Sequence, residues 1–122
     1  KQWEDSAMLN AYETRIKQLA TLCINNEIKP VFCSQPSILS ANFIQGTYVG
    51  NRAFQGESAL HFMQKMHLFN ERVQRVCRYY NLDFIDLEKE LEPSPSHYYD
   101  NFHFTTAGSN EVAQIILKNI HL

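Results

Sequence analysis

The 122-residue sequence lacks a long apolar run, an excess of charge of one sign, internal repeats and low-complexity segments. No apolar stretch approaches the roughly 18–20 residues that a membrane-spanning helix needs, so we expect no transmembrane segment. Eleven basic residues against thirteen acidic ones give a formal net charge of -2, without a basic stripe. We therefore expect no nucleic-acid partner.

Cysteine is also scarce. Cys23, Cys33 and Cys77 are odd in number, far apart and flanked by apolar residues, which predicts three reduced, buried thiols. The apolar content of 44% is that of a folded globular domain. The sequence shows no signal-peptide anatomy and opens directly into a helical pattern, as if cut from a longer chain. These features do not indicate a cellular compartment.

Three segments carry apolar residues at the three- and four-residue spacing of amphipathic helices. This spacing predicts helices over about 5–25, 58–80 and 107–120. Thr105 or Thr106 offers a side-chain cap for the last helix. Residues 37–57 show no sustained period, and we interpret them as a mobile lid over an apolar substrate or as a self-packed surface excursion.

Two short apolar runs, 29–33 and 82–87, lie between the helices and predict strands. Strands that alternate with long helices favour parallel pairing through right-handed crossovers, with both faces of each strand buried. Two parallel strands make a poor sheet alone. We therefore expect further strands from a preceding segment or a partner chain.

The most informative segment is the loop before the last helix, where Asp100 precedes His103 by three residues. A tight turn there lets the carboxylate accept from one ring nitrogen, which fixes the tautomer and stabilises the imidazolium. Spacing alone leaves three interpretations open: a catalytic pair, a structural loop contact, or metal ligands with His97 nearby. No further ligand sits at metal-binding spacing on a regular element, so we expect no metal or other cofactor.

A resemblance adds to this interpretation. The block Asp-Asn-Phe-His-Phe-Thr-Thr-Ala-Gly at 100–108, followed by Val112 and Ala113, resembles the last conserved block of the SGNH (GDSL-like) hydrolases. The run Pro-Val-Phe-Cys-Ser-Gln-Pro at 30–36 is similar to the strand of that family that ends in a Gln-Pro turn beside the active site. The resemblance implies that residues 1–122 are the C-terminal half of one α/β domain, a three-layer α/β/α, flavodoxin-like parallel-sheet fold.

The resemblance also implies an activity, the hydrolysis of carboxylic esters through an acyl-enzyme. His103 would be the general base and Asp100 its orienting partner. The family's nucleophilic Ser, Gly and Asn blocks are absent, and Ser34 and Ser40 lack the expected context. We therefore expect an N-terminal segment or a companion chain to supply the nucleophile, and the chain alone to be inactive. The substrate would be a small-molecule, carbohydrate or lipid ester.

Other residues near the expected crevice have two interpretations each. Gln35 and Pro36 would contact substrate or simply form a turn. Tyr99 and Phe104 would line an acyl or aryl pocket or simply pack. His61, His67 and His121 are interpreted as surface residues. The alternative to an esterase is a non-catalytic SGNH-like or flavodoxin-like binding domain, in which Asp100 and His103 are structural.

Overall fold

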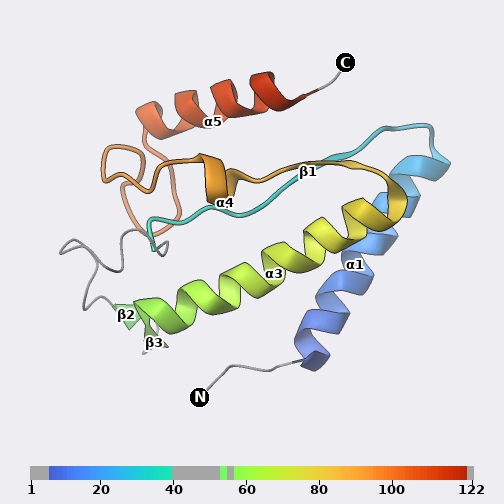
Figure 1. The fold of residues 1–122 in the computed structure, drawn as a ribbon, viewed down its shortest axis with the longest axis horizontal. Helices are drawn as coiled ribbons and strands as arrows, with labels where there is room; N and C mark the ends of the chain where they lie inside the picture. The colour runs from blue at the N-terminus through green and yellow to red at the C-terminus, as the bar shows by residue number, and fades with distance from the viewer. Residues whose placement is uncertain (1–5, 40–52, 55–56, 121–122) are drawn as a thin grey trace.

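The computed structural model describes residues 6–39, 53–54 and 57–120, and Figure 1 shows their arrangement. Within these ranges the helices and strands run as follows: α1 Ser6–Asn25, β1 Val31–Cys33, β2 Ala53–Phe54, β3 Glu57–Ser58, α3 Ala59–Tyr80, β4 Asp83–Ile85, α4 Leu87–Glu90 and α5 Thr106–Asn119. The three long helices begin and end within about one residue of the predicted bounds. The predicted cap of α5 is confirmed, because the Thr105 side chain accepts from the Gly108 N–H at 3.1 Å.

Strands β1 and β4 pair in parallel, with Val31 opposite Asp83 and Cys33 opposite Ile85, as the helix–strand order predicted. The predicted three-layer α/β/α parallel-sheet fold is wrong, however. The described residues are mostly helical and contain only two short parallel strands. Each has three residues, and Cys33 is exposed, so the pair is too small to form a middle layer buried on both faces.

The core forms where helices cover the strand pair. In Figure 1, α5 lies on one side of β1 and β4, and α3 lies on the other, with α1 packed against α3. One buried cluster joins the strand pair, α4, α5 and the adjoining loops. Its members are Ile38, Leu39, Ile85, Leu87, Leu91, Tyr98 and Ile115. On α3, Val73, Val76 and Cys77 are buried as well.

An ion-pair cluster links α1 to α3. The buried carboxylate of Glu13 accepts from Arg75 at 2.6 and 2.8 Å and from Arg72 at 3.1 Å. The Arg75 hydrogen bond is the main reason that the pKa of Glu13 lies below its usual value. Both oxygens of this desolvated carboxylate thus accept hydrogen bonds from guanidinium groups of α3, which fixes the helices against each other.

The cysteines depart from the prediction in one respect. All three thiols are free, but only Cys77 is buried, while Cys23 is half-buried and Cys33 is exposed. Burial raises the pKa of the Cys77 thiol to about 11.

Among the described residues, no helix is both long enough and apolar enough to cross a lipid bilayer.

Candidate active site

A tight turn between Tyr98 and Phe104 carries the predicted pair. Tyr98 and Phe104 form an antiparallel bridge, and the Tyr99 N–H donates to the His103 carbonyl at 3.1 Å. At the tip of the turn, Oδ1 of Asp100 accepts from the N–H groups of Phe102 at 2.9 Å and His103 at 2.7 Å. A short Asp side chain that bonds the backbone two and three residues ahead makes this turn a local property of the sequence.

The second carboxylate oxygen reaches the His103 ring. Oδ2 of Asp100 lies 2.7 Å from Nδ1 of His103. The backbone N–H of His103 is the largest cause of a lowered Asp100 pKa, followed by the Phe102 N–H and the ring contact. The ionised carboxylate can only accept, so in a neutral ring Nδ1 carries the proton and Nε2 keeps a free lone pair. Nε2 is then available as a base.

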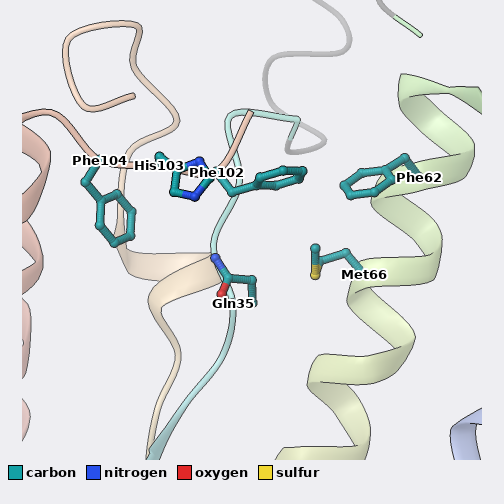
Figure 2. A pocket seen from close by; sticks show the side chains of 6 residues that line it. All are labelled: Gln35, Phe62, Met66, Phe102, His103 and Phe104. Carbon is teal, nitrogen blue, oxygen red and sulfur yellow. The ribbon is translucent and has the colours of Figure 1, made fainter. Parts of the chain in front are cut away.

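His103 borders a cavity of about 480 Å³ (Figure 2). Phe62 and Met66 reach it from α3, Gln35 from the turn after β1, and Phe102, His103 and Phe104 from the turn between Tyr98 and Phe104. The rings of Phe62 and Phe102 lie 5.6 Å apart between their centroids. The structure therefore brings together three residues named from the sequence, Gln35, His103 and Phe104, around a mainly apolar space.

Besides Asp100, two other named residues, Pro36 and Tyr99, do not line this cavity. Pro36 is buried, and its carbonyl accepts from Nε2 of Gln35 at 2.9 Å. Tyr99 is 69% exposed and stacks on the His103 ring at 5.6 Å between centroids and an interplanar angle of 14°. These positions favour a supporting role for both residues: Pro36 holds the amide of Gln35, and Tyr99 covers one face of the imidazole.

The hydroxyl group of Ser34, the residue before Gln35, is engaged elsewhere. Ser34 is buried, donates to Oδ1 of Asp86 at 2.8 Å and accepts from the Glu88 N–H at 2.8 Å. Among the side chains that the structure describes, no Ser, Thr or Tyr hydroxyl is hydrogen-bonded to His103. Ser40 and the apolar residues that suggested a lid (Phe43, Ile44, Tyr48 and Val49) lie outside the described residues.

Metal ligation was the third interpretation of the pair. In the part of the chain that the structure describes, no three His, Cys, Asp or Glu side chains are grouped so as to hold an ion. His97 forms a different contact, with its Nδ1 2.8 Å from the Glu92 carbonyl.

Sequence analysis missed a second polar cluster next to Gln35. Asn70 on α3 is buried and bonds both the backbone of Gln35 and the carboxylate of Glu88. Glu88 in turn contacts His67, which the sequence suggested was an isolated surface residue. The one available signal was an Asn at an apolar stripe position of the predicted helix.

Comparisons with known proteins found no relative of this chain. No family model matches the chain, and no curated protein and no solved structure matches it either. The resemblance of the block 100–108 to SGNH hydrolases thus stays a prediction that rests on the sequence of these residues.

Proposed function

We propose that this chain supplies the His-Asp part of a serine esterase site that hydrolyses carboxylic esters. The observation that carries the proposal is the 2.7 Å contact between Nδ1 of His103 and Oδ2 of Asp100 beside the cavity. This contact sets the tautomer in which Nε2 is the acceptor, and that tautomer is the one a general base requires.

The chemistry follows from that tautomer. Nε2 of His103 takes the proton of a serine hydroxyl as its oxygen attacks the ester carbonyl. The resulting imidazolium is stabilised by Asp100 and returns the proton to the alcohol oxygen as the ester C–O bond breaks. Water then repeats the sequence on the acyl-enzyme, with His103 as base again, and releases the carboxylic acid.

The nucleophile is the part that the described residues do not supply. We propose that a serine from a preceding segment of the same protein or from a companion chain meets Nε2 of His103. Ser34 is unsuited to this role because its oxygen is already bonded to Asp86 and to the Glu88 N–H.

The proposal is tested by ester hydrolysis. The protein, purified with whatever segment or chain accompanies it, is assayed with p-nitrophenyl acetate and p-nitrophenyl butyrate. We expect His103→Ala to lower kcat by about 10³-fold or more with little change in the thermal midpoint. His97→Ala is the matched control, since it removes a loop histidine from the same region and should retain activity. Equal turnover in His103→Ala and wild type contradicts the proposal.

One observation favours the alternative, a binding domain in which the pair is structural. Oδ1 of Asp100 accepts from two backbone N–H groups, so the carboxylate stabilises the turn whether or not His103 acts as a base. In that case, His103→Ala and Asp100→Asn change the stability of the protein. No preparation, with or without an accompanying segment or chain, then hydrolyses the esters.

A further inference from the structure

Asn70 divides its side-chain amide between the turn that follows β1 and Glu88 on α4. Its Oδ1 accepts from the Gln35 N–H at 2.8 Å, and its Nδ2 donates to the Gln35 carbonyl at 2.9 Å. The second Nδ2 hydrogen donates to Oε2 of Glu88 at 2.9 Å. Asn70 is only 6% exposed, so its amide has little access to water and depends on these hydrogen bonds.

The partner carboxylate is itself held in place. Oε1 of Glu88 lies 2.7 Å from Nδ1 of His67, one helical turn before Asn70 on α3. The backbone N–H of Glu88 donates to Oγ of Ser34, the residue before Gln35. The turn is therefore tied to α3 through Asn70 and to the start of α4 through Ser34.

Gln35, whose backbone is held by Asn70, also places its side-chain amide in the cavity. The Gln35 side chain lines the cavity together with His103 (Figure 2), and one hydrogen of its Nε2 is used by the Pro36 carbonyl. Since both backbone polar groups of Gln35 are bonded to Asn70, the position of this amide relative to His103 depends on α3.

We propose that Asn70 is a positioning residue, which holds Gln35 so that its side-chain amide meets the substrate beside His103. The role given to Gln35 rests on the proposed esterase function. The clamp, by which we mean the two hydrogen bonds between Asn70 and the Gln35 backbone, rests on the structure alone. If Asn70 only filled space, an apolar side chain would serve better, because a buried amide costs free energy unless each of its polar atoms is hydrogen-bonded.

The test separates the contact with Glu88 from the contact with Gln35. Asn70→Asp places a second carboxylate against Glu88 and removes the donor to the Gln35 carbonyl. Adding Glu88→Gln restores a donor–acceptor pair between positions 70 and 88, but the Gln35 carbonyl still has no donor when the introduced carboxylate is ionised. Asn110→Asp, at an exposed position on α5, is the matched control.

Each full-length variant is examined in two ways. Thermal unfolding reports the stability of the fold. Hydrogen exchange of the Gln35 backbone amide and the NMR shift of the Gln35 side-chain amide report whether position 70 still holds Gln35. The assembled enzyme is assayed with p-nitrophenyl acetate at about pH 8, where an aspartate is ionised.

We expect Asn70→Asp to lower the thermal midpoint and the double variant to regain most of it. The double variant should still show a shifted Gln35 side-chain signal, faster exchange at Gln35, and kcat/KM about tenfold below wild type, mainly through KM. Recovery of kcat/KM and of the Gln35 signal together with the midpoint overturns the positioning role. If no variant or wild type hydrolyses esters but the Gln35 signals respond as stated, the clamp stands and the esterase proposal fails.

Discussion

His103 and Asp100 are joined twice within one turn: through the ring, at 2.7 Å between Nδ1 and Oδ2, and through the backbone, at 2.7 Å between the His103 N–H and Oδ1. The two oxygens thus have different partners, one for the imidazole and one for the turn. This double attachment fixes the ring orientation although the His103 side chain is 64% exposed.

The first prediction concerns Asp100 and acid stability. Hydrogen bonds to the ionised carboxylate hold its pKa below the ordinary 3.8, so its contribution to stability is complete above that value and is lost as the pH falls through the folded-state pKa. Between about pH 5 and about pH 2, wild type should therefore lose more free energy of unfolding than Asp100→Asn. Urea unfolding at several pH values measures this, and parallel curves for the two proteins would refute it.

The second prediction concerns His67. Its hydrogen bond with Glu88 raises the pKa of His67 above 6.5, so the stabilisation is complete below that value and disappears as the pH rises through the folded-state pKa. In Glu88→Gln the His67 pKa should move back down, as measured by NMR titration. Because the His67 side chain is 56% exposed, we expect less than about 1 kcal/mol of stability from this contact. An unchanged His67 pKa in the variant would show that Glu88 is not the cause.

The third prediction concerns Gly108, near the start of α5. A Cβ atom at this position would collide with the His97 carbonyl, which already accepts from the Thr105 N–H at 3.0 Å. Gly108→Ala should therefore cost about 2 kcal/mol of unfolding free energy, because the start of α5 must move away from the loop. Chemical denaturation measures the cost, with the exposed neighbour Ser109→Ala as the control. Equal stability of Gly108→Ala and wild type would disprove the close contact.

The fourth prediction concerns the buried hydroxyl of Tyr98. Tyr98 is 4% exposed, and its hydroxyl has no hydrogen-bond partner among the described residues. Tyr98→Phe removes a desolvated polar group and keeps the ring contact with Phe104, so unfolding free energy should rise by up to about 1 kcal/mol. Tyr79→Phe, at a position 76% exposed, should be neutral. A loss of stability in Tyr98→Phe would reveal a partner for the hydroxyl.

Features set by local spacing could be predicted from the sequence. The three long helices follow from apolar periodicity, the start of α5 from the Thr105 cap, and the Asp100–His103 contact from a three-residue separation in a loop. The parallel pairing of β1 with β4 followed from the helix between them.

Features that depend on distant residues could not be predicted in this way. The three-layer fold was implied by the resemblance of the 100–108 block to SGNH hydrolases, and the structure has only a pair of three-residue parallel strands beside the helices. The β2–β3 pair was missed because residues 37–57 have no period of two. The contact of Asn70 with Gln35 spans 35 positions, and no local pattern announces it.

The central claim is that Nε2 of His103 activates a serine nucleophile, and labelling by a fluorophosphonate ester tests it most directly. The protein, isolated with its accompanying segment or chain, is treated with the probe, and the modified peptide is identified by mass spectrometry. We expect one serine outside the described residues to be labelled in wild type and in His97→Ala, with labelling reduced by at least about 10²-fold in His103→Ala. Labelling of the same serine at equal rates in wild type and His103→Ala, or no labelled serine in any assembly, would contradict the account.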